Sequence, residues 1–154
     1  MKNRSGNLKS EVYLLCKKKL EERILNFDTA MKTAQEASNS EDKSSAGDKY
    51  ETSRAMGQLD RDMNAKQLVE AQTELSNFLK ISIEIKSDTI IPGSIIETNN
   101  GTFFIAAGIG TIELKKTKIV VLSPKSPLAI AMSGKKNNDQ FSFNGKQFQI
   151  INIL

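Results

Sequence analysis

The feature that most constrains the fold is a polar, small-residue segment, residues 38–50, which lies between two long runs of helical periodicity. Apolar residues recur at steps of three to five on both sides of it, and such steps place them on one face of a helix. They are Leu8, Val12, Leu15, Leu20, Ile24, Phe27, Met31 and Ala34 upstream, and Met56, Leu59, Met63, Ala71, Leu75 and Phe78 downstream. We therefore predict helices over residues 8–37 and about 45–79. They should fold back as an antiparallel coiled-coil hairpin, domain 1–80, with each helix burying its apolar stripe on the other.

The predicted tip of this hairpin is acidic. Residues 38–51 carry the carboxylates of Glu41, Asp42, Asp48 and Glu51 against two lysines. At about 1.5 Å per residue, a helix of roughly 30 residues would hold them some 45 Å from its other end. Asp48 has an equally good explanation as a helix-capping residue, because it follows Ser45 by three positions. Glu41 and Asp42 have no such structural duty and are the better functional candidates.

Composition narrows the possible chemistry. The chain of 154 residues has no histidine, which removes Cys-His and Ser-His-Asp catalysis and histidine-based zinc sites. Its single cysteine, Cys16, falls within the apolar pattern of the first helix and is expected to be a buried thiol in a reducing compartment. No apolar run reaches membrane-spanning length and no signal-type segment is present, so we expect a cytoplasmic protein without a membrane partner. Residues 1–80 hold 14 basic and 13 acidic side chains and residues 81–154 hold 8 and 5, which does not suggest a large electrostatic term with nucleic acid.

After residue 80 the pattern changes from helical to alternating. Ile81, Ile83 and Ile85 alternate with polar residues, as in a half-buried strand. Further strands are expected within residues 90–96, 102–107, 118–122, 140–143 and 146–153, with Asn144-Gly145 as a hairpin turn. Residues 127–133 read as a short helix closed by Gly134. The expected fold class is therefore α+β: the coiled-coil hairpin, then an antiparallel sheet with one short helix over residues 81–154.

The run LSPKSPLAIAMSGK, residues 122–135, resembles a C-terminal signature of the bacterial Gre-type (GreA/GreB) transcript cleavage factors. In that family a strand is followed by Ser-Pro-Leu, an Ala-Leu pair and Gly-Lys at this spacing, and then by Gly-Asp, where this chain has Asn138-Asp139. Pro92-Gly93-Ser94 and residues 148–150 are also similar to family segments. The similarity covers about 60 C-terminal residues, after a helical hairpin like that of the family.

The resemblance implies an FKBP-like C-terminal module that binds RNA polymerase and a coiled coil that enters its secondary channel. Carboxylates at the tip, here Glu41, Asp42 and Asp48, would aid catalysis, with Glu41 and Asp42 as metal ligands only within the polymerase complex. The cofactor would be Mg²⁺ shared with the polymerase active site. The chain would have no cofactor of its own and would stimulate that active site rather than catalyse a reaction by itself. Mg²⁺ prefers carboxylate oxygens and keeps several waters, which suits this role. The expected polymerase-binding residues are Ser126, Pro127, Leu128, Met132, Gly134 and Lys135.

The predicted partners are therefore RNA polymerase and, only within that complex, nascent RNA; the chain itself is expected to be a monomer. The tip differs from the family pattern of Asp, two residues and Glu, since alignment on Tyr50 without a gap places Lys43 and Ala46 there. With a one-residue gap Asp42 stands at the Asp position, but the Glu position still lacks a carboxylate. Glu41, Asp42 and Asp48 would supply charge from shifted positions. A cleavage-deficient modulator or inhibitor of polymerase is accordingly the first alternative. An FKBP-like prolyl isomerase and a coiled-coil adaptor that pairs with another helix are the others.

Overall fold

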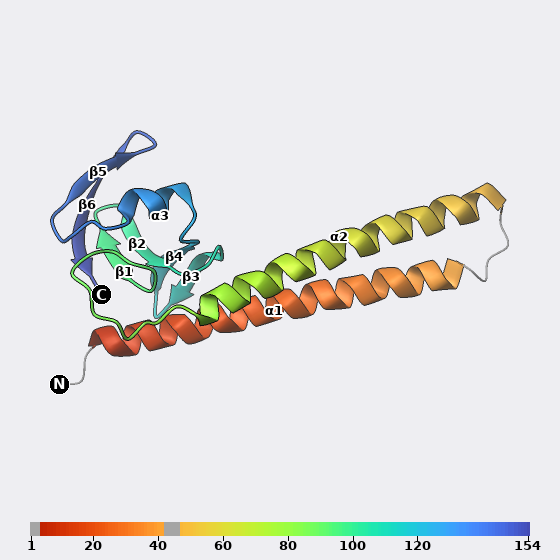
Figure 1. Cartoon of the computed structure of the whole chain (residues 1–154), viewed down its shortest axis with the longest axis horizontal. Coiled ribbons are helices and arrows are strands. Elements are labelled where there is room, and N and C mark those ends of the chain that lie inside the picture. Colours follow the sequence, from red (N-terminus) through yellow and green to blue (C-terminus); the bar gives the residue numbers. More distant parts are fainter. Residues whose placement is uncertain (1–3, 42–46) are drawn as a thin grey trace. The chain divides into compact units, whose positions relative to one another are not determined.

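The computed structural model describes the backbone of residues 4–41 and 47–154 and the side chains of residues 6–37 and 51–154. It has two long helices, α1 (Arg4–Glu41) and α2 (Gly47–Leu79), followed by six strands and a short helix (Figure 1). The later elements are β1 (Ile95–Thr98), β2 (Gly101–Ile105), β3 (Gly110–Leu114), β4 (Thr117–Leu122), α3 (Pro127–Met132), β5 (Gln140–Phe143) and β6 (Lys146–Ile153). The α+β class predicted from the sequence is confirmed.

The chain forms two compact units. One, the sheet unit, combines Met1–Lys19 with Leu75–Leu154, and the other, the helical unit, is Leu20–Glu74. The division therefore falls within both long helices, whereas the periodicity alone suggested a boundary at residue 80. The reason is that the first part of α1 is built into the sheet unit: Glu11 accepts a hydrogen bond from Lys115 at 3.2 Å, and Lys9 donates one to the carbonyl of Ile83 at 3.4 Å.

The helical unit is an antiparallel pair formed by α1 and α2, as predicted. The prediction that Met56, Leu59 and Met63 are buried in the first half of α2 is wrong. Met56, Leu59 and Met63 are 57%, 59% and 62% exposed, while Ala71 is buried. Arg61 instead donates a hydrogen bond to Gln35 of α1 at 3.1 Å. Residues that contact a neighbouring helix recur every three or four positions. Such steps, counted back along α2 from the buried Ala71, reach Arg61, and Met63 lies about 200° from Arg61 around the helix axis.

The sheet has the order β3-β4-β2-β1-β6-β5. All neighbouring strands are antiparallel except β2 and β4, which pair in parallel, so the expectation of an all-antiparallel sheet is corrected at this one place. The strand expected over Ile81–Ile85 is also wrong. The Oγ of Ser82 accepts a hydrogen bond from the backbone N–H of Glu84 at 3.3 Å, a local turn that competes with strand pairing, and Ile85 is 57% exposed.

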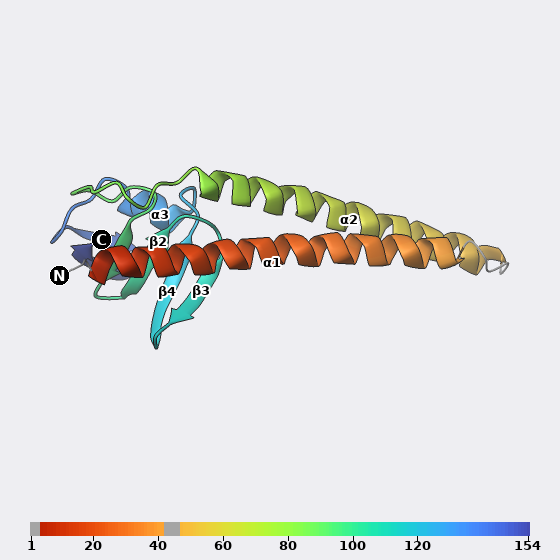
Figure 2. The same ribbon diagram turned by 90° about the horizontal axis from the view of Figure 1, so that it is seen from below.

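Two hairpins show how turn chemistry sets the sheet. Asn144 and Gly145, at φ 48° and 77°, join β5 to β6 as predicted. The β3–β4 hairpin was not expected, because its turn residues are Lys115 and Lys116. They adopt φ 50° and 67°, a region that residues with a Cβ rarely occupy. Figure 2 shows β3 and β4 running together to this shared turn.

Both faces of the sheet are buried. On one face α3 contributes Ala129 and Met132 to a cluster that also contains Ile90, Ile96, Phe103, Ile105, Phe148 and Ile150. Neighbouring positions along the strands point to the other face, where Ile95, Phe104, Ile112, Ile119 and Val121 are at most 2% exposed. The sheet unit also buries Val12 and Cys16 of α1 and Phe78 of α2, and the Phe78 ring stacks on Tyr13 at 4.7 Å. This double core fixes α3 and the loops around it.

Candidate functional site

The α3 segment begins with a tightly bonded turn. The Oγ of Ser126 accepts a hydrogen bond from the N–H of Ala129 at 3.3 Å and donates one to the carbonyl of Ser123 at 2.8 Å. Ser126 is thus the N-cap of the helix, and Pro127 occupies its first turn, where a missing N–H costs nothing. The Ser-Pro pair of the predicted polymerase-binding set therefore has a structural duty, which is to fix the start and direction of α3.

The inner side of α3 anchors the helix. Ala129 is 2% exposed and Met132 is fully buried, and Leu128 packs partly buried against the same cluster. Met132 was predicted among the polymerase-binding residues, but the structure places its side chain in the core, where it is not available to a partner. Its contribution is to hold α3 against the sheet.

The outer side of α3 presents an apolar surface. Pro127 is exposed, and Ile130, three positions later, is 63% exposed although it is a large aliphatic residue. Sequence reasoning missed Ile130 because the run PLAIAM is apolar at every position, so its periodicity does not separate the inner from the outer side. Single exposed apolar residues are common on protein surfaces. Ile130 is a candidate contact because it lies within the predicted polymerase-binding segment, residues 126–135.

The residues after α3 are also held in place. Gly134 adopts φ 79°, the left-handed conformation expected after a helix, and its N–H donates to the carbonyl of Ile90 at 2.9 Å. The N–H of Ile90 returns a bond to the carbonyl of Lys135 at 2.9 Å. The Lys135 ammonium lies 5.8 Å from the centre of the Phe141 ring. Of the six predicted binding residues, Pro127 and Gly134 are exposed and Ser126, Leu128 and Lys135 are partly exposed. We call the exposed parts of these five residues and of Ile130 the α3 surface.

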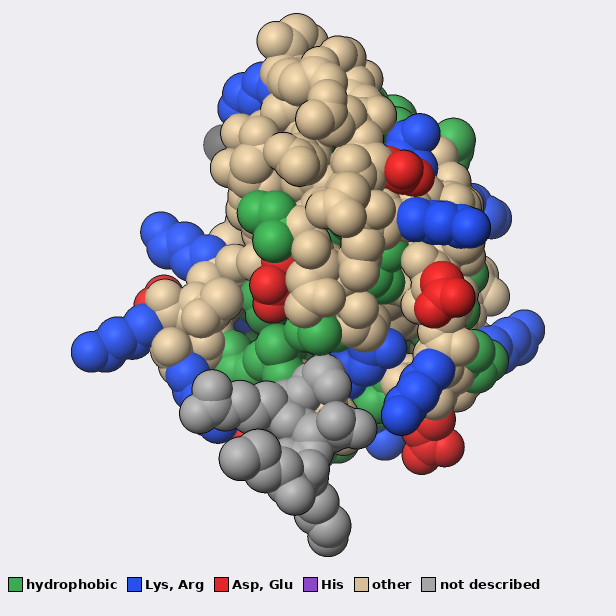
Figure 3. Space-filling model, turned by 90° about the vertical axis from the view of Figure 1, so that its left-hand side faces the viewer, with side chains coloured by type: hydrophobic (Ala, Val, Ile, Leu, Met, Phe, Trp, Pro, Cys, Tyr) green, Lys and Arg blue, Asp and Glu red, His purple; other side chains and the backbone are tan. Residues whose placement is uncertain are grey.

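Formal charge divides sharply between the two units. The sheet unit holds 15 basic and 6 acidic residues, a net of +9, and the helical unit holds 7 and 12, a net of −5. Figure 3 shows lysine and arginine side chains projecting from several sides of the face that it presents. The division of the sequence at residue 80 hid this difference, because it assigned the basic start of α1 to the acidic helices. Opposite charges on two units of one chain suit a partner that offers acidic groups at one place and cations at another.

The predicted catalytic and metal-binding carboxylates lie where the structure describes no side chains. Glu41 is the last residue of α1 and Asp48 is near the start of α2, while Asp42 lies outside the described backbone. Among the residues whose side chains are described, no group of three acidic, cysteine or histidine side chains is placed to hold a metal ion. The roles of Glu41, Asp42 and Asp48 therefore remain predictions from the sequence.

Three phenylalanines of the sheet unit pack with one another. The ring centroid of Phe148 lies 6.2 Å from that of Phe103 and 5.0 Å from that of Phe141, on which it stacks. These rings belong to the core cluster or pack against it. None of them lines the cavity that this unit contains near the start of α1. No feature of the described residues favours a prolyl isomerase site over the α3 surface.

Comparison with models of known protein families and with curated proteins found no match to this chain. Within the described parts of the chain, none of the helices combines the length and the apolar character needed to cross a membrane.

Proposed function

We propose that this protein is a Gre-like transcription factor that binds bacterial RNA polymerase through the α3 surface and acts with its helical unit in the secondary channel. The observation that carries the proposal is the charge division, +9 on the sheet unit and −5 on the helical unit. A basic unit with an apolar contact suits docking on an acidic protein surface. An acidic helical pair suits a channel that leads to catalytic Mg²⁺.

Backbone geometry adds support at the resembling residues. Asn138 stands where the family has glycine, and it adopts φ 72°, a conformation that asparagine tolerates better than most residues. Asp139, the next residue of that motif, accepts a hydrogen bond from the N–H of Lys136 at 2.8 Å. Gly93, in the Pro-Gly-Ser segment, has φ 95°. The glycine-like positions of the resemblance thus coincide with positions that need left-handed backbone.

At the tip, Glu41 and Asp42 would hold a Mg²⁺ ion only inside the polymerase complex, with Asp48 as a further carboxylate. The chain supplies charge and position, and the polymerase supplies the reacting RNA and its own metal. A variant of the same proposal, in which the tip occupies the channel and inhibits or modulates transcription without RNA cleavage, is favoured by Lys43 and Ala46, which stand at the family's two acidic positions.

The test uses the full chain, core RNA polymerase and stalled, backtracked elongation complexes in Mg²⁺ buffer. We expect co-purification with the polymerase and shortening of the RNA from its 3′ end. The double variant Glu41→Ala/Asp42→Ala should still bind but should not shorten the RNA. Tight binding of the wild-type protein with slowed elongation and no shortening would select the modulator form. Absence of polymerase binding at micromolar concentrations would refute both forms.

A further inference from the structure

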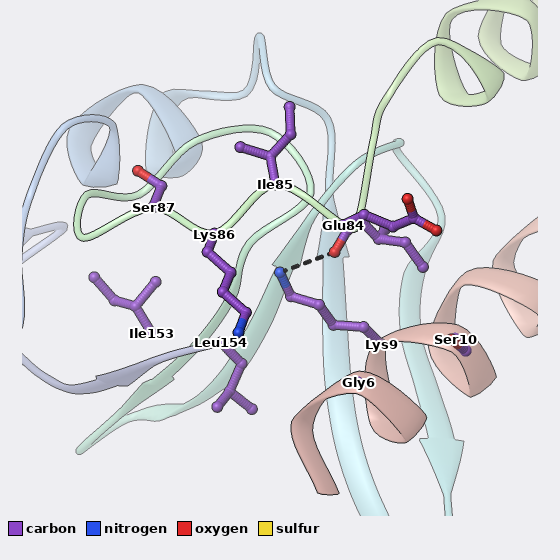
Figure 4. Close-up of a pocket in the computed structure, with 10 residues that line it drawn as sticks. Gly6, Lys9, Ser10, Glu84, Ile85, Lys86, Ser87, Ile153 and Leu154 are labelled. Carbon is purple, nitrogen blue, oxygen red and sulfur yellow. Dashed lines mark hydrogen bonds between the residues drawn. The ribbon is translucent and has the colours of Figure 1, made fainter. Parts of the chain in front are cut away.

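The sheet unit contains a cavity of about 500 Å³ that is separate from the α3 surface. It lies between the first turns of α1, the irregular segment after α2 and the end of β6 (Figure 4). Its volume is within the range of pockets that hold small molecules. The lining residues are Gly6, Lys9, Ser10, Ile83, Glu84, Ile85, Lys86, Ser87, Ile153 and Leu154.

Lys9 is the unusual residue of this cavity. Only 9% of it is exposed, and its ammonium group donates one hydrogen bond, to the carbonyl of Ile83 at 3.4 Å. An ammonium group has three donors, and a buried cation is stable only when it is well paired. Among the described residues no carboxylate forms an ion pair with Lys9, and burial lowers the pKa of its side chain. Among the described residues, the three donors of the Lys9 ammonium group therefore have one protein acceptor, the carbonyl of Ile83.

The lining combines cationic and aliphatic side chains. Figure 4 shows the side chains of Lys9 and Lys86 both directed into the space between α1 and the end of β6, so this space has two cationic groups. Ile83, Ile153 and Leu154 supply aliphatic surface to the same cavity. The one acidic side chain in the lining, that of Glu84, belongs to an exposed residue. A ligand that matches both kinds of group needs an anionic head and a short hydrocarbon body.

We propose that this cavity is a binding site for a small anionic amphiphile, specifically a monocarboxylate with a short aliphatic chain. Its carboxylate accepts hydrogen bonds from the Lys9 and Lys86 ammonium groups, and its chain packs against Ile83, Ile153 and Leu154. Charge-assisted hydrogen bonds of this kind are short and about twice as strong as neutral ones, so the head group supplies most of the selectivity. The site does not depend on the polymerase function, because none of its lining residues belongs to the α3 surface or to the tip.

Binding is measured on the full chain by titration calorimetry and by amide chemical shifts, with sodium octanoate as the probe. Octan-1-ol tests the hydrocarbon chain without the charge, and inorganic phosphate tests an anion without the chain. We expect saturable binding of octanoate, with shifts at residues 83–87 and 153–154, and at least about tenfold weaker binding of either control probe.

Two variants remove the proposed head-group contacts. Lys9→Met and Lys86→Met should each weaken octanoate binding about tenfold, because each loses one charge-assisted bond. Lys146→Met, at the exposed start of β6 and outside the cavity, should leave the affinity unchanged. Lys86 is exposed, so its variant tests the site even if Lys9→Met perturbs folding. Equal affinity for octanoate and octan-1-ol, or unchanged binding in Lys86→Met, would overturn the proposal. So would an absence of shifts at the lining residues.

Discussion

Ile130 and Met132 lie on opposite sides of α3, and alanine substitutions should therefore separate docking from folding. Ile130 is 63% exposed and Met132 is fully buried. Complete burial of a large aliphatic side chain is worth about 1.5–3 kcal/mol, so covering the exposed part of Ile130 in a complex would contribute about 1–2 kcal/mol. Ile130→Ala should accordingly weaken polymerase binding about 5- to 30-fold.

The same substitution should leave the fold nearly intact, since exposed positions usually change stability by about 0.5 kcal/mol or less and Ile130 is only partly covered. Met132→Ala, in contrast, removes a side chain from a closed core and should lower the free energy of unfolding by about 2–5 kcal/mol. Fluorescence anisotropy with labelled protein gives the dissociation constant for core polymerase, and urea unfolding followed by circular dichroism gives the stability. An unchanged dissociation constant for a folded Ile130→Ala protein would refute docking through the α3 surface.

Three further outcomes are expected from the sheet unit. A Cβ at Gly93, which has φ 95°, would lie 2.6 Å from a backbone carbonyl oxygen, so Gly93→Ala should cost more than about 1 kcal/mol in urea unfolding. Gly110→Ala has a similar φ of 92° but open space around the Cβ and should cost less; equal costs would contradict this account. Replacing Lys115-Lys116 by Asn-Gly should raise the free energy of unfolding by about 1 kcal/mol, because both positions have positive φ and the ion pair that is lost is exposed. A decrease would show that the ion pair matters more than the turn. Burial raises the pKa of the Cys16 thiol from 9.0 to about 12, so between these pH values the unfolded chain loses a proton that the native state keeps. Stability measured by urea unfolding should therefore fall as pH rises through that window, and less so in a Cys16→Ala protein.

The parts of the fold that follow local rules could be predicted from the sequence. The long helices, the α3 segment and the hairpin at Asn144-Gly145 each have a local signal: apolar spacing, a Ser-Pro start or a turn dipeptide. The hairpin at Lys115-Lys116 has no such signal, because its positive φ values are imposed by pairing of the flanking strands rather than by residue preference. The parallel pairing of β2 with β4 also depends on tertiary arrangement, which no alternation pattern specifies.

The candidate sites were less accessible to sequence reasoning. The Ser126 cap could be read from the sequence, but Met132 and Ile130 could not be assigned to the inner and outer sides of so short an apolar helix. The cavity around Lys9 brings together residues more than 140 positions apart, so no sequence spacing reveals it. The exposure of Met63 shows the same limit, because the side of α2 that contacts α1 there carries a charged residue, Arg61, which apolar spacing does not reveal.

The strand order has a consequence for how copies of this protein meet in solution. The longest strand, β6 with eight residues, lies inside the sheet, whereas the outermost strands, β3 and β5, have only five and four. Few unpaired backbone groups are therefore presented at the margins, and β3 carries a glutamate, Glu113, at an exposed position. Short outer strands, one of them with an exposed charge, make the addition of a strand from another chain less favourable at either edge of the sheet.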